Sequence, residues 1–447
     1  MKPYKDAIID FDITDLGTSG EGIGSFNGFK IFIEGALPLE CVQGRIIDVK
    51  SHYALAKLIK VLTPSPYRIK PPCPLFDRCG GCQIMHLDYV KQLEVKRKRV
   101  MDAFQRIGKL PILEMEETRP SPLPLAYRNK IQLPVTGVQG SIEIGLYERG
   151  SHHVVPVSQC LIHSSLGETI YREVARVVKS SSIRPYHEKT GEGELRHILI
   201  RTTFFLKEGL VVLVTTSSPS ELLKNIAKKI IKIPEVKGVV HHKNTRRDNV
   251  VLDQNFTLLE GQSFIEEKLC GMIFKISAAS FFQVNPYQAE RLYEKALEFA
   301  DLTPASYVLD AYCGIGTLSL LIAQRVKKVI GVECVPQAIE DAKENAKCNA
   351  INNTEFVCGQ SEKVIVSLSS IDVVFLNPPR KGCDPRVLLE LKRLKPRTMI
   401  YISCDPATLA RDAHVLASYG FKTQAIKAFD MFPQTTHVET IAKFTSD

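Results

Sequence analysis

The sequence predicts a modular α/β protein, with an OB-like β-barrel at the N-terminus, a mixed α+β central domain and a C-terminal domain built on a parallel sheet. Short apolar runs separated by glycine-rich turns fill residues 1–62. Prolines and cysteines follow this segment, and strands alternate with helices from about residue 276 onward. The 447 residues suffice for roughly three domains of ~150 residues each. We therefore expect domains at 1–62, 63–275 and 276–447.

The composition is that of a folded protein with a moderate positive charge. Hydrophobic residues make up 44% of the chain and charged residues 24%, which excludes a disordered chain. The net charge of +9 favours a polyanionic partner. No run reaches the ~18 uninterrupted apolar residues of a membrane span, and the first residues lack the apolar core of a signal peptide. The 12 cysteines are therefore expected to be reduced thiols or metal ligands in the cytoplasm.

The first 62 residues contain the signals of a small barrel. Apolar runs at 8–9, 30–33 and 45–49 predict short strands, and the glycine-rich stretch 17–24 predicts a turn. Four or five such strands fit an OB-like barrel, a fold often used on nucleic acid. A β module without any ligand fits the same pattern.

A basic helix is predicted over residues 89–109. Its apolar positions recur at helical spacing through Val90, Leu93, Val100 and Phe104. The expected outer face carries Lys91, Lys96, Arg97, Lys98, Arg99, Arg106 and Lys109. These cations either form a solvated face or contact RNA phosphates.

The central region reads as mixed strands and helices. Strands are predicted at 130–135, 142–147, 197–203 and 210–216. A second basic cluster, at 241–243 and 246–247, is predicted to lie in a loop.

A glycine turn after the strand 307–310 predicts a nucleoside site. Gly314 and Gly316 let the backbone approach a ligand closely at the start of a helix near Thr317. The third glycine of the dinucleotide fingerprint is missing, which favours a smaller ligand. Glu333 ends the next strand, 23 residues after Asp310, where it can accept hydrogen bonds from ribose hydroxyls. These features suggest S-adenosylmethionine; the alternative is a structural turn and a surface glutamate.

Two further strands end in segments that suit a reaction site. The strand 371–376 runs into Asn377-Pro378-Pro379-Arg380, where the prolines stiffen the loop. The strand 398–403 ends at Cys404. We expect these strand ends to lie along one edge of the parallel sheet.

Methylation of a pyrimidine at carbon 5 needs one cysteine and one base. A thiolate added to carbon 6 makes carbon 5 nucleophilic, and a base must then remove the carbon-5 proton. Cys404 is the candidate nucleophile. A terminal hairpin over 421–428 and 436–444 supplies Glu439 as candidate base, with His437 on the same strand face. The alternatives are a buried thiol and a surface glutamate.

Together these segments resemble the RNA 5-methyluridine methyltransferase family. The matching segments are Ser280-Phe281-Phe282-Gln283-Val284-Asn285, the glycine turn at 310–320, 377–382, 403–412, His437-Val438-Glu439-Thr440, Tyr127-Arg128-Asn129-Lys130 and Leu195-Arg196-His197. The resemblance implies a class I, Rossmann-like methyltransferase domain, an N-terminal TRAM barrel, and Cys404 and Glu439 as nucleophile and base. It also implies that Gln283, Tyr312, Glu333 and Asn377 line the S-adenosylmethionine site. The family usually has aspartate where this chain has Asn377, so we expect altered cofactor affinity.

Cys73, Cys79 and Cys82 form a cluster at spacings of six and three residues, and Cys160 follows 78 residues later. Four thiolates suit either tetrahedral zinc or a four-iron cluster, and free thiols are the remaining alternative. Iron–sulfur members of the family carry the same spacing, so the resemblance implies a [4Fe-4S] cluster. Its expected role is structural or RNA-positioning, because this methyl transfer needs no redox step.

The resemblance also implies an RNA substrate, with 23S rRNA favoured over tRNA, and a monomer is expected. The target uridine would have to be flipped out or unpaired. One rival is a methyltransferase acting on exocyclic amines, which uses Asn-Pro-Pro followed by an aromatic residue; here Arg380 replaces the aromatic. Cytosine carbon-5 enzymes carry a cysteine in that segment, and residues 377–380 have none. A non-catalytic RNA-binding protein is the third possibility.

Overall fold

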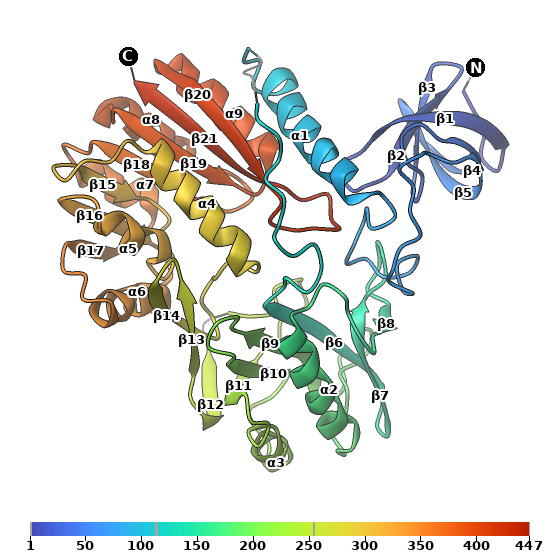
Figure 1. The fold of residues 1–447 in the computed structure, drawn as a ribbon. Helices are drawn as coiled ribbons and strands as arrows, with labels where there is room; N and C mark the ends of the chain where they lie inside the picture. The colour runs from blue at the N-terminus through green and yellow to red at the C-terminus, as the bar shows by residue number, and fades with distance from the viewer. Residues whose placement is uncertain (1, 112–114, 254, 447) are drawn as a thin grey trace.

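The computed structural model describes residues 2–111, 115–253 and 255–446 (Figure 1). The N-terminal strands close into a barrel in the order β1-β2-β3-β5-β4. Its core contains Phe11, Ile13, Ile31 and Ile46, all nearly inaccessible to solvent. The predicted OB-like barrel is therefore confirmed. Its strands are β1 (Ile8–Leu16), β2 (Gly22–Phe26), β3 (Phe29–Ile33), β4 (Cys41–Val49) and β5 (Tyr53–Thr63).

Helix α1 (Tyr89–Arg106) follows the cysteine-rich segment and lies between the barrel and the C-terminal helices (Figure 1). Asp88 caps it by accepting a hydrogen bond from the Val90 backbone N–H at 3.0 Å. The prediction that Lys96 lies on the outer face is wrong: this side chain is fully buried and forms an ion pair with Asp430. Val90, expected on the apolar face, is 64% exposed. A buried cation is compatible with the helix because a distant acid neutralises it.

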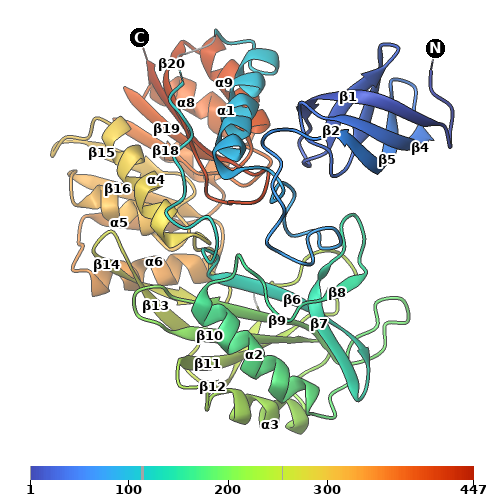
Figure 2. The ribbon, with the colours of Figure 1, turned by 45° about the vertical axis from the view of Figure 1, so that its right-hand side comes forward.

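The central sheet has the strand order β12-β11-β10-β9-β6-β7-β8 (Figure 2). Helices α2 (Ser165–Lys179) and α3 (Glu221–Ile230) pack on one face, through a core that includes Ile131, Ile198 and Val211. The hairpin β13 (Phe264–Leu269) and β14 (Met272–Ser277) packs on the other face. The strands are β6 (Lys130–Val138), β7 (Ser141–Tyr147), β8 (Val154–Pro156), β9 (Leu195–Thr202), β10 (Gly209–Thr215), β11 (Val236–Lys243) and β12 (Phe256–Gly261).

The second basic cluster differs from its prediction. Residues His241, His242 and Lys243 end strand β11 and are not in a loop. Both histidines are buried: His241 lies beside the Thr215 hydroxyl at 2.8 Å, and His242 lies 2.9 Å from the Asn255 carbonyl oxygen. The histidines therefore belong to the sheet and offer no exposed surface to RNA.

The C-terminal sheet has the order β17-β16-β15-β18-β19-β21-β20. Strands β15 to β19 are parallel, and β21 runs antiparallel between β19 and β20. The predicted alternation of strands and helices is confirmed. The elements are α4 (Pro286–Phe299), β15 (Tyr307–Asp310), α5 (Thr317–Ala323), β16 (Lys328–Glu333), α6 (Pro336–Cys348), β17 (Thr354–Cys358), α7 (Ser361–Val364), β18 (Val373–Leu376), α8 (Pro385–Leu394), β19 (Thr398–Ser403), α9 (Pro406–Ser418), β20 (Phe421–Phe429) and β21 (Glu439–Ser446).

The sheets follow one another along the chain much as predicted. The predicted boundary at residue 62 lies one residue before the end of β5, and the one at residue 275 falls within β14. Both boundaries stay predictions. Among the described residues, no helix is long and apolar enough to cross a membrane.

Candidate active site

The glycine turn after β15 forms a backbone cradle at the carboxyl end of the sheet. Gly316 has φ +79°, and a Cβ there would come within 3.0 Å of the Phe356 ring. Gly314 has φ +55°, and nothing lies within 4 Å of the position its Cβ would take. The turn is therefore tightly packed at Gly316 and open at Gly314, which leaves room for a ligand against the backbone. Helix α5 begins at Thr317, as predicted.

A cavity opens at this cradle and holds about 390 Å³ of empty space, including its mouth. Gln283, Tyr312 and Asn377, from three separate segments, all line it. The structure thus brings together three of the four residues predicted for the cofactor.

Glu333 is not among the residues that line this cavity. Its carboxylate accepts backbone N–H bonds from Cys334 at 2.7 Å and Val335 at 3.0 Å, close to the start of α6. It still lies near the turn, because its negative charge contributes to the raised pKa of Asp310. The carboxylate is therefore fixed at the end of β16, beside the cradle.

Several residues that line the cavity were not predicted from the sequence as cofactor-binding residues. Asp310 is fully buried, and burial raises its pKa to about 6 while the Ser319 hydroxyl donates to it at 2.6 Å. Tyr293 on α4 hydrogen-bonds with Gln283 and lies near both Glu439 and Asp310, whose charges add to burial in raising its pKa. A tyrosine within a helix carries no motif, so only the fold could find it. The other lining residues include Phe281, Phe282, Cys313, Ile315 and Leu318.

Strand pairing brings Cys404 and Glu439 to the same edge of the sheet. Ser403 at the end of β19 is the direct partner of Thr440 near the start of β21. Cys404 follows Ser403, and Glu439 precedes Thr440. They are close enough for the Glu439 charge to contribute to the raised pKa of Cys404. The predicted shared strand face of His437 and Glu439 is wrong, because β21 begins only at Glu439.

Burial dominates the electrostatics of this pair. Glu439 is 3% exposed, and burial raises its pKa to about 8, which Arg380 partly offsets. Burial also raises the pKa of Cys404, while the Arg380 guanidinium, hydrogen-bonded to the thiol, lowers it. Cys404 precedes the N-terminus of α9, whose dipole favours a thiolate. Arg380 and the helix end thus both stabilise negative charge on the sulfur.

The loops that carry Arg380 and Cys404 are held to each other. Asp412 on α9 accepts hydrogen bonds from the Cys383 backbone N–H at 2.9 Å and the Tyr401 hydroxyl at 2.7 Å. Gly382 has φ +81°, and a Cβ there would lie 2.7 Å from the Asp412 carboxylate. The Asn-Pro-Pro loop is therefore fixed against the helix that follows the cysteine.

Comparison with known proteins identifies the family. The tRNA (Uracil-5-)-methyltransferase profile matches residues 223–443. A relative from Clostridium acetobutylicum, named an uncharacterized RNA methyltransferase, is 42% identical over 436 residues, which cover 96% of this chain and 95% of the relative. A Bacillus cereus relative with the same description is 42% identical over 443 residues, covering 98% and 97%. This chain belongs to the RNA (uracil-5-)-methyltransferase family.

The fold of this methyltransferase also has a solved counterpart. The Pyrococcus abyssi tRNA (uracil-54, C5)-methyltransferase, solved in complex with S-adenosyl-L-homocysteine, is 28% identical with a TM-score of 0.80. The match covers 98% of this chain and 100% of that one. The TRAM domain profile matches residues 4–59, so the barrel is a TRAM domain. The predicted class I fold and the predicted enzyme class, an S-adenosylmethionine-dependent RNA (uracil-5-)-methyltransferase, are confirmed.

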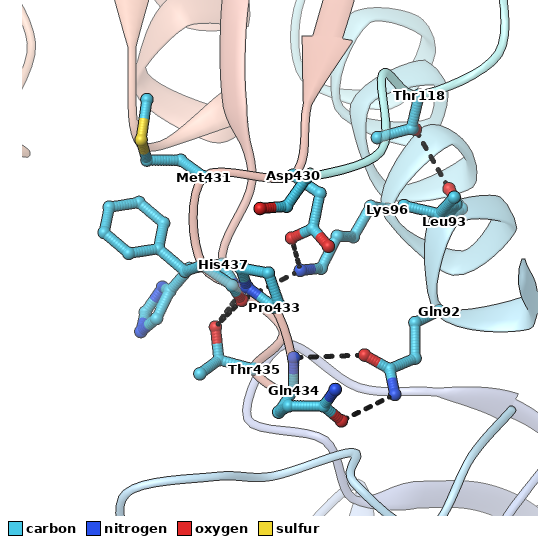
Figure 3. A network of polar contacts seen from close by, with 12 residues as sticks. Gln92, Leu93, Lys96, Thr118, Asp430, Met431, Pro433, Gln434, Thr435 and His437 are labelled. Carbon is cyan, nitrogen blue, oxygen red and sulfur yellow. Dashed lines mark hydrogen bonds and ion pairs between the residues drawn. The ribbon is translucent and has the colours of Figure 1, made fainter. Parts of the chain in front are cut away.

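The loop 430–437 precedes Glu439 and is held against α1 by an ion pair and hydrogen bonds (Figure 3). The fully buried Lys96 and Asp430 form an ion pair, and Lys96 also donates to the Phe432 carbonyl oxygen at 3.0 Å. Tyr89 donates from its hydroxyl to the second Asp430 oxygen at 2.8 Å. A buried charge pair with additional hydrogen bonds fixes this loop relative to the helix.

Other parts of the methyltransferase hold the same loop. The Gln92 side chain donates to Gln434 Oε1 at 3.0 Å and accepts from the Gln434 backbone N–H at 3.1 Å (Figure 3). Backbone N–H groups of Gln83 and Ile84, in the cysteine-rich segment, both donate to the Gln434 carbonyl at 3.1 Å. Thr436 donates to the Thr18 carbonyl of the barrel at 2.8 Å. The segment before Glu439 thus contacts both the barrel and the cysteine-rich segment, and it connects them to the C-terminal sheet.

The four predicted metal-binding cysteines lie in one neighbourhood. Cys73, Cys82 and Cys160 pack against a small apolar cluster that includes Phe76 and Tyr127. Burial raises the pKa of Cys82, and the charges of the other three cysteines raise it further. In the chain as described, no three His, Cys, Asp or Glu side chains are grouped so as to hold a metal ion. The thiols are therefore near one another without being in contact around one point.

Proposed function

We propose that this methyltransferase transfers a methyl group to carbon 5 of a uridine in RNA, with Cys404 as nucleophile and Glu439 as base. The β19–β21 pairing carries the proposal, because it sets both residues at one sheet edge. The cavity lined by Gln283, Tyr312 and Asn377 opens at that same edge. Arg380 beside Cys404 supports this chemistry over exocyclic-amine methylation, since an aromatic residue would occupy that position in the rival class.

The chemistry divides between the cysteine and the glutamate. S-adenosylmethionine, when bound, supplies the methyl group from a positively charged sulfur. The Cys404 thiolate adds to carbon 6 of the uracil, and the ring electrons displaced toward carbon 5 form the new carbon–methyl bond. Glu439 then takes the carbon-5 proton. The electron pair left behind restores the carbon 5–carbon 6 double bond and expels the thiolate.

The burial of Glu439 suits this task. A pKa of about 8 makes the ionised Glu439 a stronger proton acceptor than an ordinary carboxylate and places its titration near neutral pH, where a general base is most effective. Burial also excludes water from the reacting atoms. Gln283 and Tyr312 would hold S-adenosylmethionine in the cradle, with Asn377 as a neutral acceptor and Glu333 at the ribose end.

We propose 23S rRNA as the substrate and tRNA as the alternative. A second cavity lies where the barrel, α1 and the start of α9 meet, and its lining includes Lys98, Arg99 and Arg106. The lining also includes Pro406, two residues after Cys404. Asp15 and Asp102 also line the cavity and form ion pairs with Lys98 and Arg106, so three cations face two acids there. This positive excess supports an RNA path from the TRAM barrel to the reaction site. A monomer in the cytoplasm stays a prediction.

We also propose a [4Fe-4S] cluster held by Cys73, Cys79, Cys82 and Cys160. Four neighbouring thiols supply the ligands that such a cluster needs, and the spacing of Cys73, Cys79 and Cys82 with a distant Cys160 is that of the iron–sulfur members of the family. Bound iron would also stabilise thiolates that burial disfavours.

The decisive experiment traps the proposed intermediate. The protein is incubated with S-adenosylmethionine and 5-fluorouridine-substituted 23S rRNA or tRNA, and denatured. Fluorine cannot leave as a proton, so a covalent protein–RNA adduct should persist with wild type and be absent in Cys404→Ala. An adduct with 23S rRNA alone supports the proposed substrate, and one with tRNA alone supports the alternative. Methyl label entering RNA without any adduct would overturn carbon-5 chemistry.

A further inference from the structure

Two cations face each other directly in the central sheet. Lys130 begins β6, and its cross-strand partner in the antiparallel pair is Arg201 of β9. Direct partners share one face of the sheet with Cβ atoms about 4.5–5.5 Å apart, and like charges there are destabilising. Arg128 adds a third cation, since its Nε donates to the Lys130 carbonyl at 2.9 Å. This arrangement of like charges therefore lowers the stability of the folded protein.

Among the described residues, no acid forms an ion pair with Lys130, Arg201 or Arg128. Lys130 Nζ makes no hydrogen bond or ion pair with any described residue, and the Nε of Arg201, a residue 4% exposed, is buried without a partner. Asp341 is the acid whose charge reaches Arg201. Its oxygens accept hydrogen bonds from the uncharged side chains of Ser277, Ser280 and Gln337, so Asp341 offsets part of the Arg201 charge without forming an ion pair with it.

The pKa values of both Lys130 and Arg201 are lowered. Burial together with the charges of Arg201 and Arg128 lowers the pKa of Lys130 to about 7. Burial lowers the pKa of Arg201 to about 10. Both groups would be stabilised in their charged forms by an anion placed between them.

The cluster lies beside the candidate active site. Arg201 donates to the Ser280 carbonyl at 2.5 Å. Asn129 donates from its backbone to the Val284 carbonyl at 2.9 Å and from its side chain to the Gln283 carbonyl at 3.0 Å. The loop that delivers Gln283 to the cavity is thus docked on the start of β6 and the end of β9. Figures 1 and 2 both show these strands on the side of the central region that faces the catalytic sheet.

We propose that Lys130, Arg201 and Arg128 bind a backbone phosphate next to the target uridine. This inference rests on the proposed function, because it takes the RNA to enter beside loop 280–285. Lys130 and Arg128 are partly exposed and can reach a polymer, while the buried Arg201 lies beneath them. Arginine forks and lysine ammonium groups are the usual phosphate partners. Hydrogen bonds to backbone carbonyls fix Arg128 and Arg201, so these two cations set the register of the RNA as well as attract it.

The first test compares Lys130→Ala with Lys228→Ala, which removes an exposed charge from α3. Binding to an unmodified 23S rRNA transcript is measured between about 50 and 200 mM KCl. We expect Lys130→Ala to lower the slope of log affinity against log salt by about 1. Lys228→Ala should leave the slope unchanged. A wild-type slope in Lys130→Ala would overturn the phosphate site.

The melting temperature distinguishes a phosphate site from a purely structural role, because the loss of a structural contact would lower it. Without RNA, Lys130→Ala should melt at or above the wild-type temperature, because the like-charge repulsion with Arg201 is gone. Inorganic phosphate should raise the melting temperature of wild type more than that of the variant. A variant that melts lower and responds equally to phosphate would overturn the proposal.

The second test removes single charges from the RNA. An oligoribonucleotide that wild type methylates receives one neutral methylphosphonate linkage at a time on either side of the target. One linkage should weaken binding to wild type and have no further effect on Lys130→Ala. Equal effects on both proteins at every linkage would overturn the site. Failure of wild type to methylate any RNA would overturn the proposed function instead, and the salt slopes and melting temperatures keep the two failures distinct.

Discussion

At the scale of single residues, the proposed base is a buried carboxyl group whose pKa the fold raises. Glu439 is buried and has a pKa of about 8, against an ordinary value of 4.5. Arg380 offsets part of this shift and also lowers the pKa of Cys404. The Arg380 guanidinium therefore influences both the proposed nucleophile and the proposed base.

Glu439→Gln should reduce the dependence of the unfolding free energy on pH. Between pH 4.5 and about 8, the folded state holds a proton on Glu439 that the unfolded chain has lost, so wild type loses stability as the pH rises through this window. The neutral glutamine has no such dependence. In urea unfolding, the variant should therefore gain on wild type from about pH 5 to about pH 8. A pH-independent difference between the two proteins would show that the pKa of Glu439 is not raised.

The same substitution should stop the reaction at a defined point. Without a base, methylated RNA should remain covalently attached to Cys404, and turnover should fall on the order of 10²–10⁴-fold. Denaturing gels with ordinary RNA, not the fluorinated form, measure this adduct. Free methylated RNA released at the wild-type rate would exclude Glu439 as the base.

Asn377→Asp should tighten S-adenosylmethionine binding roughly fivefold, because a hydrogen bond to a charged acceptor gains about 1 kcal/mol over a neutral one. Asn377 lines the cavity and is partly exposed, so the new charge is only partly desolvated. The neutral S-adenosylhomocysteine should gain less than the cationic donor. Binding calorimetry with both ligands is the measurement, and unchanged affinities would remove any role for the departure from the family residue.

At the scale of elements, helix α1 and the loop 430–437 form one unit. Their link is the buried pair of Lys96 and Asp430, supported by Tyr89 and Gln92 (Figure 3). The loop ends two residues before Glu439. Movement of α1 would therefore be transmitted to the position of the base.

Lys96→Met should destabilise the protein by about 3–5 kcal/mol, because it leaves Asp430 buried without its partner charge. Lys98→Met on the same helix is the control; its ion pairs are exposed and should cost at most about 1 kcal/mol. Urea unfolding of both variants gives the comparison. Adding Asp430→Asn to Lys96→Met should recover part of the loss, and an additive double mutant would contradict a direct interaction.

At the scale of the whole molecule, the cysteine site joins distant parts of the chain. Cys73, Cys79 and Cys82 lie before α1, whereas Cys160 lies just before α2 in the central region. Gln83 and Ile84, next to Cys82, contact the loop before Glu439 through the Gln434 carbonyl. A bound cluster would thus brace the segment on which the catalytic loop rests.

Anaerobically purified wild type should be brown and contain about four irons per chain. Cys160→Ser should lose the colour and melt at a lower temperature, since binding to the native state stabilises it. Metal analysis and visible absorption check both points, and Cys348→Ser, an exposed cysteine far along the chain, is the control. A colourless wild type with one zinc per chain would rule out the iron–sulfur cluster.

Local pattern was sufficient for many elements of this protein. The strands 307–310 and 398–403 and the start of α5 at Thr317 agree with their predictions, because glycine turns and apolar runs mark them directly. The barrel and the alternating C-terminal elements were also predicted from short-range signals. Tyr312 and Asn377 meet at one cavity because they follow β15 and β18, whose carboxyl ends share an edge, whereas Gln283 reaches it from the loop between β14 and α4.

The tertiary structure decided what depends on contacts between distant residues. Periodicity put Lys96 on the outer face of its helix, and only the position of Asp430, 334 residues later, explains why the charge is buried. The proximity of Cys404 and Glu439 follows from the register of β19 with β21, which no local signal encodes. The Lys130–Arg201 pair likewise comes from strand register. Sequence thus determined the elements and the chemical types at their ends, while long-range pairing determined which charges meet.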